Sequence, residues 1–159
     1  MYIKAQIAPS TIFGQGLFAS EPVPHGKIIC FFCINAQLID EKRFLQAVAS
    51  NEQPMVRTAT RQAGKYYTHG NENEPYTFIN HSFTPNLLCH VGMVIARRDI
   101  APREELTLDY RTLIDDTDVG VYRDAISGKE IRGFSAKETL LRTARELIEI
   151  IGDLENWEG

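Results

Sequence analysis

The run Phe78-Ile79-Asn80-His81-Ser82-Phe83-Thr84-Pro85-Asn86 decides how this chain folds, together with Glu105-Leu106-Thr107-Leu108-Asp109-Tyr110. Both runs are polar and aromatic, and both lie between apolar, β-branched segments. Burying their amides and hydroxyls is costly unless each polar group finds a hydrogen-bond partner. We therefore expect the two runs to meet, to satisfy one another and to form the functional site.

The size and composition predict a single globular domain. The chain has 159 residues, of which 43% are hydrophobic and 24% charged, values that are ordinary for a globular protein with one core. Its net charge of −4 disfavours direct nucleic-acid binding and suits a basic protein or peptide substrate. No apolar run approaches the roughly 20 residues that span a bilayer. The N-terminus also lacks the apolar stretch of a secretory signal, so we expect an intracellular protein with no membrane segment.

Three cysteines cannot all pair with one another, which suits a reducing compartment. Cys30 and Cys33 have the CxxC spacing of a redox pair or of half a zinc site. They lie in an apolar run, 28–34, that predicts a strand, and no second CxxC follows. We therefore favour burial of these thiols over redox or metal chemistry, and we predict no metal site.

The pattern predicts short strands separated by turns, followed by one long helix. Strands are expected near residues 2–7, 27–34, 65–68, 87–91, 93–100 and 106–108, with 51–64 as a connecting loop that contains a short strand at 55–56. A short amphipathic helix is expected over 39–48, with Asp40 as its N-cap. Ser135 and Glu138 have capping-box spacing, and apolar residues at three- and four-residue intervals predict a helix over 136–151. We interpret its apolar stripe as core packing, with a homodimer contact as the alternative.

The segment Gly14-Gln15-Gly16 separates two apolar runs near the N-terminus. Two glycines around one polar residue indicate either a turn with positive φ or a backbone that a ligand approaches closely. The segment is not the dinucleotide-binding fingerprint, because no third glycine and no helix follow it.

The order of these motifs resembles that of the SET-domain protein lysine methyltransferases. The resemblance covers residues 1–112 and rests on four segments: 14–19, 78–86, 96–100 and 104–110. It implies a mainly β fold with α elements, a β-clip of small sheets with a knot-like crossing of the two opening runs. It also implies a small, stand-alone, bacterial-type member. Residues 1–112 would be the SET core, 113–134 a closing segment without the zinc-binding cysteines, and 135–159 a C-terminal helix with an acidic tail.

The resemblance further implies S-adenosylmethionine as the methyl donor and a lysine on a basic protein as the acceptor. The protein would then be cytoplasmic, or nuclear if it acts on chromatin. Tyr110 would be the catalytic residue. The donor would be held by Gln15, Gly16, Leu17, Asn80, His81, Tyr110 and Phe134, with Asn80 at its amino-acid end, the His81 backbone at the adenine edge and Phe134 over the adenine. A lysine channel would be lined by residues from Tyr66, Tyr67, Tyr76, Phe78, Leu108 and Tyr122.

Three further expectations concern single residues of the two runs. Asn86 is expected to tie its turn together rather than to contact a ligand. His81 as a general base is the alternative to its role in donor binding. Leu108 stands where many relatives carry Phe or Tyr, a position associated with the number of methyl groups added, so that number is left open.

Methyl transfer from a sulfonium to an amine is an in-line displacement, so alignment and electrostatics are the main tasks of such an enzyme. Lysine has a pKa of about 10.4, and forming its neutral amine at pH 7 costs roughly 4.6 kcal/mol. An apolar channel beside a positively charged sulfur lowers that pKa by desolvation and charge repulsion. Two alternatives keep the fold. One is a catalytically silent module that binds a lysine-bearing tail or an assembly partner, and the other is a methyltransferase that acts on a non-protein amine.

Overall fold

The computed structural model describes residues 1–32, 36–70, 74–114, 116 and 122–154. Within these ranges the chain forms small β-sheets, two short helices and one long C-terminal helix, which confirms the expected mainly β fold with α elements. The strands are β1 (Ala5–Pro9), β2 (Gln15–Ala19), β3 (Ile28–Phe31), β4 (Gln37–Asp40), β5 (Thr60–Ala63), β6 (Tyr66–His69), β7 (Asn80–His81), β8 (Leu87–His90), β9 (Met93–Ala96) and β10 (Thr107–Leu108). The helices are α1 (Glu41–Ala49), α2 (Gln53–Thr58) and α3 (Ala136–Gly152), with 3₁₀ turns η1 (Pro75–Phe78) and η2 (Tyr110–Thr112).

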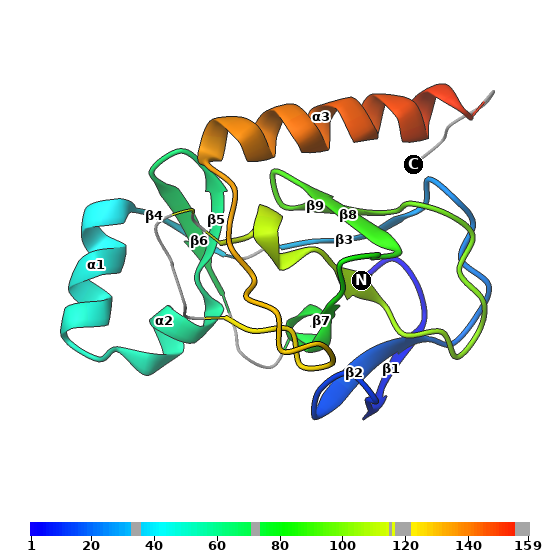
Figure 1. Cartoon of the computed structure of the whole chain (residues 1–159), viewed down its shortest axis with the longest axis horizontal. Coiled ribbons are helices and arrows are strands. Elements are labelled where there is room, and N and C mark those ends of the chain that lie inside the picture. Colours follow the sequence, from blue (N-terminus) through cyan, green and yellow to red (C-terminus); the bar gives the residue numbers. More distant parts are fainter. Residues whose placement is uncertain (33–35, 71–73, 115, 117–121, 155–159) are drawn as a thin grey trace.

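The sheets are arranged around one principal core. β1 and β2 form an antiparallel hairpin, β9 lies between β3 and β8, β6 lies between β4 and β5, and β7 pairs with β10 in parallel. Figure 1 shows α3 along one side above β8 and β9, the β1–β2 hairpin on the opposite side, and α1 and α2 at one end. Leu17, Ile29, Val94 and Leu106 are completely buried in the core that joins these layers.

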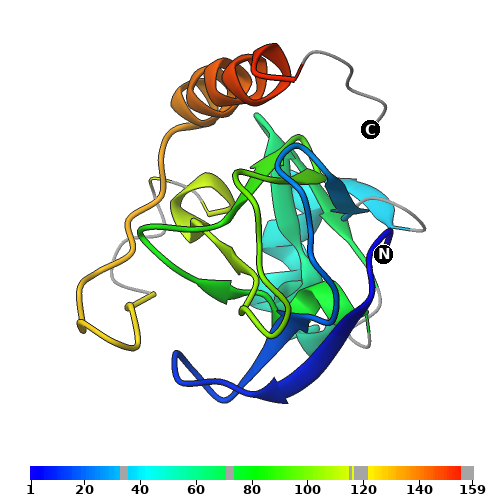
Figure 2. The ribbon, with the colours of Figure 1, turned by 90° about the vertical axis from the view of Figure 1, so that its right-hand side faces the viewer.

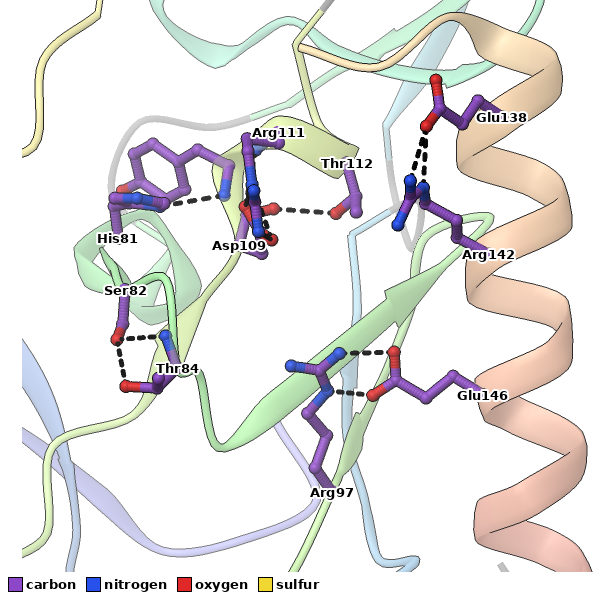
Figure 3. Close-up of polar contacts among 11 residues, drawn as sticks. His81, Ser82, Thr84, Arg97, Asp109, Arg111, Thr112, Glu138, Arg142 and Glu146 are labelled. Atoms are coloured by element: carbon purple, nitrogen blue, oxygen red, sulfur yellow. Dashed lines mark hydrogen bonds and ion pairs between the residues drawn. The ribbon is translucent and has the colours of Figure 1, made fainter. Parts of the chain in front are cut away.

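α3 is fixed to the β3-β9-β8 sheet by both apolar and polar contacts. Leu147 and Ile150 pack against Leu88 and Ile95. His90 Nδ1 and Thr143 Oγ1 lie 2.8 Å apart in a hydrogen bond. The guanidinium of Arg97 also forms a two-pronged ion pair with Glu146 (Figure 3). The apolar stripe of this helix therefore packs on the core.

The outer side of α3 carries two exposed apolar residues, Leu141 and Ile148. Contact of this side with a second copy of the chain stays a prediction.

Both helix N-termini that the sequence marks are capped as expected. Asp40 Oδ1 accepts a hydrogen bond from the Arg43 amide at 2.8 Å, and α1 begins at the next residue. Ser135 Oγ accepts from the Glu138 amide at 3.3 Å, and α3 then runs to Gly152. These side chains satisfy amide groups that have no partner in the first turn of a helix.

Two sequence expectations about the fold are wrong. The segment 51–64 is not a loop with a strand at 55–56, because it forms α2 followed by β5. A proline in the first turn of α2 was the missed signal, since its fixed φ suits a helix start. The second strand of the β8–β9 hairpin also ends at Ala96 instead of continuing to Ile100. The Arg97 amide donates to Asn86 O at 2.9 Å and the Ile100 amide to Val23 O at 2.8 Å, so the backbone turns to other partners.

The two polar runs meet as expected, in the short parallel pair of β7 and β10. Asn80 lies opposite Thr107 and His81 opposite Leu108, and the Ser82 amide extends the pair by donating to Leu108 O at 2.9 Å.

Asn86 ties the same two runs together at their other end. Its Nδ2 donates to Glu105 O at 2.8 Å, and its Oδ1 accepts from the Thr107 amide at 2.8 Å. The expected role of Asn86 in holding its turn is thereby confirmed, and the costly polar groups of one run are satisfied by the other.

No helix in the described ranges is both long enough and apolar enough to cross a membrane.

The turn between β8 and β9 contains a strained residue. Val91 has φ +48° and Gly92 has φ +82°, the pattern of a type I′ turn, in which both central residues need positive φ. A β-branched residue is poorly suited to that conformation, whereas asparagine adopts it readily. We predict that Val91→Asn raises the free energy of unfolding by about 1 kcal/mol, measured by urea denaturation. Val91→Ala should give a smaller gain, because alanine also resists positive φ. An asparagine variant no more stable than the parent would show that the turn is unstrained.

Candidate functional site

The carboxylate of Glu105 organises the turn between β1 and β2. Its Oε1 accepts a hydrogen bond from Asn80 Nδ2 at 2.7 Å, and both of its oxygens lie 2.8 Å from the hydroxyl of Ser10. Ser10 Oγ in turn accepts from the amides of Ile12 at 2.8 Å and Phe13 at 3.3 Å. Glu105 therefore fixes, through Ser10, the turn that carries Phe13.

Asn80 holds the same turn from its other side. Besides Glu105, its amide nitrogen donates to the backbone carbonyls of Phe13 at 3.2 Å and Gln15 at 3.1 Å. The nitrogen of this side chain is thus occupied by the protein itself. A direct hydrogen bond from Asn80 to a methyl donor stays a prediction.

The two glycines of the first motif serve different purposes. Gly14 has φ +50° and makes the turn. Gly16 lies in β2, where a Cβ atom would stand 2.2 Å from Glu105 Oε1. Glycine at position 16 thus makes room for the Glu105 carboxylate of the protein itself, whereas the close approach of a ligand to this backbone stays a prediction.

A cavity of about 640 Å³ opens beside this turn. That volume lies within the range of small-molecule sites in proteins. Its apolar wall includes Phe13, Phe78 and Ile131, and its polar wall includes Asn80 and Asp124. The complete lining is Ile12, Phe13, Gly14, Gln15, Thr77, Phe78, Asn80, His81, Tyr110, Tyr122, Arg123, Asp124, Ala125 and Ile131. We call it the donor cavity, after the methyl donor that the sequence resemblance leads us to expect beside these residues.

A second cavity, of about 210 Å³, is also lined by Tyr110. It is lined by Phe32, Thr58, Ala59, Thr60, Thr68, Gly70, Tyr76, Thr77, Ile79, Leu108, Tyr110, Leu113, Ile114 and Tyr122. None of these lining residues carries a charge at neutral pH. Thr77, Tyr110 and Tyr122 line both cavities, so the two spaces meet at these side chains. We call the second space the acceptor cavity, after the lysine that the sequence resemblance leads us to expect beside Leu108 and Tyr122.

The hydroxyl of Tyr110 is held in one orientation at this junction. It donates to the Ile79 carbonyl at 2.7 Å. Burial, with smaller contributions from Tyr122 and Glu105, raises the pKa of Tyr110 to about 12. The hydroxyl is therefore protonated at neutral pH and cannot act as a general base, but its oxygen can still accept a hydrogen bond.

His81 supports Tyr110 from the neighbouring strand. The Tyr110 amide donates to His81 Nδ1 at 3.1 Å (Figure 3). Burial lowers the pKa of His81, although the Asp109 and Asp124 carboxylates act in the opposite direction. The ring is thus neutral with its proton on Nε2, an atom that is buried and has no hydrogen-bond partner in the described part of the chain. The alternative that His81 acts as a general base loses support, because Nδ1, its only unprotonated nitrogen, already accepts a hydrogen bond from the Tyr110 amide.

The other residues expected at the site fall into two groups. Gln15 and Phe78 line the donor cavity, Tyr76 and Leu108 line the acceptor cavity, and Tyr122 lines both. Gly16, Leu17, Tyr66, Tyr67 and Phe134 line neither cavity.

Each residue of the second group has a different surrounding. Leu17 is completely buried in the core, and Tyr66 is exposed. Tyr67 stacks on Phe44 with 4.4 Å between ring centroids. Phe134 lies against two arginines, Arg111 and Arg142. The parts assigned to these residues in donor or substrate binding stay predictions.

Sequence reasoning missed Ser10, Glu105 and Asp124. Glu105 belongs to the opening motif, but nothing local in the sequence indicates that it would bind a serine 95 positions away. Asp124 lines the donor cavity from a turn in which its carboxylate accepts from the Ser127 amide at 2.7 Å. An aspartate three residues before a serine is a recognisable turn signal, although it does not reveal the cavity.

The cysteines that the structure describes are buried. Burial chiefly, with a smaller effect of Cys89, raises the pKa of the Cys30 thiol to about 12, which leaves negligible thiolate at neutral pH. Cys33 and most of the acidic loop 115–118 lie outside the described residues, as does the end of the acidic tail. Across the described ranges no three His, Cys, Asp or Glu side chains are grouped to hold a metal ion.

Comparison with known families gives one match. A family model described as the SET domain matches residues 14–111, more than half of the chain. The matched segment includes Gly14-Gln15-Gly16, both polar runs and Tyr110. A search of curated proteins gives no match.

We predict that Glu105→Gln destabilises the protein by about 1–3 kcal/mol. Glutamine keeps the shape of the side chain, but it replaces one of the two accepting oxygens with an NH₂ group. The side chain can then no longer accept hydrogen bonds from Ser10 and Asn80 as the carboxylate does. The measurement is the midpoint of urea unfolding, with Glu149→Gln, at an exposed position of α3, as a control that should change it little. Equal midpoints for Glu105→Gln and the parent would contradict the organising role of Glu105.

Proposed function

The chain belongs to the SET-domain family, and from this premise we propose that it is a protein-lysine N-methyltransferase that uses S-adenosylmethionine. The single observation that carries the proposal is that the side chain of Tyr110 lines both cavities. One cavity has mixed polar and apolar walls, and the other has uncharged walls. A donor and an acceptor that enter from opposite sides would meet at one fixed oxygen atom, as alignment catalysis requires.

The residues of the donor cavity fit S-adenosylmethionine in size and chemistry. The molecule combines a flat base, a ribose and a zwitterionic amino acid, so it needs aromatic surfaces and polar groups of both signs. Phe13, Phe78 and Ile131 supply the apolar surface, and Arg123 and Asp124 supply opposite charges. When bound, S-adenosylmethionine supplies a methyl group on a positively charged sulfur.

The acceptor cavity fits the side chain of a lysine. Its lining combines aliphatic and aromatic groups such as Phe32, Tyr76 and Leu108, and the rings of Phe32 and Tyr76 lie 5.0 Å apart. An ammonium ion that enters this uncharged space loses its hydration, which favours loss of its proton to solvent. The lining would thus lower the pKa of a bound lysine, so that a larger fraction of it is the neutral amine, whose formation in water at pH 7 costs roughly 4.6 kcal/mol.

Tyr110 would orient the neutral amine rather than deprotonate it. Because its hydroxyl hydrogen is bound to Ile79 O, the oxygen presents its lone pairs to the junction. A lone pair at this point can accept a hydrogen bond from the amine and so direct the nitrogen toward the donor cavity. The contribution is therefore positional and electrostatic.

The negative net charge of −4 favours encounter with a basic protein or peptide, which we propose as the substrate class. The alternative is a silent module that binds a lysine-bearing tail without transfer. The fixed, protonated hydroxyl between two cavities supports the enzyme, because a module would need the acceptor cavity alone.

The proposal is tested with labelled S-adenosylmethionine and a panel of basic proteins. We expect label on lysine, and we expect Tyr110→Phe to lower the transfer rate about 100-fold with little change in donor affinity. Phenylalanine keeps the ring that lines both cavities but removes the hydroxyl oxygen. Tyr2→Phe, which removes an exposed hydroxyl elsewhere, serves as the matched control.

Donor binding by the parent protein without any transfer would favour the silent module. No donor binding at all would overturn the assignment of the donor cavity.

A further inference from the structure

Five side chains form a continuous stack in which cations alternate with aromatic rings. Lys129 Nζ lies 4.9 Å from the centre of the Phe83 ring, and the Arg111 guanidinium lies 5.1 Å from the same ring. Arg111 is also 5.1 Å from the centre of the Phe134 ring, and the Arg142 guanidinium is 4.5 Å from it. All four distances are within the range at which a cation is attracted to the face of a ring. We call these residues the cation–aromatic stack.

Carboxylates orient both arginines of the stack. Arg111 Nη2 donates to Asp109 Oδ2 at 2.6 Å, and Arg142 pairs with Glu138 one turn earlier at 2.8 Å (Figure 3). Arg111 directly follows Tyr110, so the centre of the stack is covalently joined to the proposed catalytic residue. A guanidinium already held by a carboxylate loses less conformational entropy when it also stacks on a ring.

One wall of the donor cavity belongs to a small hairpin, residues 122–131, which we call the closing hairpin. Its own backbone bonds hold it together: the Asp124 amide donates to Lys129 O at 2.8 Å and the Ile131 amide to Tyr122 O at 3.0 Å. It contributes Tyr122, Arg123, Asp124, Ala125 and Ile131 to the cavity lining. The position of this hairpin therefore decides the shape of the cavity.

The stack joins the closing hairpin to the body of the protein at two points. Lys129, in the hairpin, contacts Phe83 of the polar run that follows β7. Beyond the hairpin, Phe134 contacts Arg111 through its ring, and its amide donates to the Arg111 carbonyl at 2.9 Å. Figure 2 shows the segment running along one side of the molecule, from the hairpin up to α3.

α3 completes the connection. Its N-cap, Ser135, directly follows Phe134, and Arg142 reaches back from the second turn to the Phe134 ring. The helix itself is fixed to the sheet through Glu146 and Thr143. The position of Phe134 is thus determined both by a rigid helix and by the residue next to Tyr110.

We propose that the cation–aromatic stack clamps the closing hairpin, so that α3 holds one wall of the donor cavity against the Tyr110 segment. Arg111, Phe134 and Arg142 are then positioning residues that act on the donor cavity from outside it. The clamp follows from the contacts alone, whereas its effect on donor affinity rests on the proposed function.

Hydrogen–deuterium exchange of the ligand-free protein tests the clamp without any donor. We expect Arg142→Ala and Phe134→Leu each to make amides of residues 122–134 exchange about two- to fivefold faster. Amides of β8 and β9 should keep their rates, which separates a loosened hairpin from general destabilisation. Phe134→Tyr keeps an aromatic face and should restore parental exchange. Arg145→Ala is the matched control, since Arg145 is exposed on the same helix and contacts no ring in the described part of the chain.

Donor binding by calorimetry then tests the consequence. Arg142→Ala should weaken S-adenosylmethionine binding about two- to fivefold, although Arg142 does not line the donor cavity. Unchanged exchange of 122–134 in Arg142→Ala would overturn the clamp, even if Phe134→Leu failed to fold. Faster exchange with unchanged donor affinity would overturn the link to the cavity. If the parent protein binds no donor, that result contradicts the proposed function. The clamp is then decided by the exchange experiment alone.

Discussion

The carboxylate of Glu105 is the contact on which the rest of the site depends. It binds Ser10 and Asn80, and through them it shapes the turn that forms one wall of the donor cavity. Its closeness to β2 also explains why residue 16 is a glycine. Glu105 lies two residues before β10 and five before Tyr110, which also lines the cavity. The segment that shapes the β1–β2 turn is therefore the one that carries the proposed catalytic residue.

The groups that hold Tyr110 in place leave the lone pairs of its hydroxyl oxygen for the proposed substrate. The amide of Tyr110 is bound by His81, and its hydroxyl hydrogen is bound by the Ile79 carbonyl. Burial keeps that hydroxyl protonated, and an uncharged cavity on one side favours a neutral amine. The proposed methyl transfer would need no strong base at such a site, because desolvation and alignment would perform most of the work.

The sequence revealed the meeting of the two polar runs because neither can be buried alone at acceptable cost. The caps at Asp40 and Ser135 were also predictable, since capping depends on neighbouring residues. The partnership of Glu105 with Ser10 was not, because it joins distant positions that share no pattern. α2 was missed because a six-residue helix shows almost no periodicity. The surroundings of Phe134 could not be derived either, since its contacts with Arg111 and Arg142 depend on where α3 packs.

The proposed methyl transfer requires a donor and an acceptor that enter from opposite sides and meet at Tyr110. A crystal structure with S-adenosylhomocysteine and a lysine-containing peptide would show whether they do. We expect the nucleoside between Phe13, Phe78 and Ile131 and the lysine beside Tyr76 and Leu108, with the thioether sulfur and the amine nitrogen facing one another at the Tyr110 hydroxyl. A nucleoside bound outside the donor cavity, or a lysine that does not reach Tyr110 through the acceptor cavity, would contradict it.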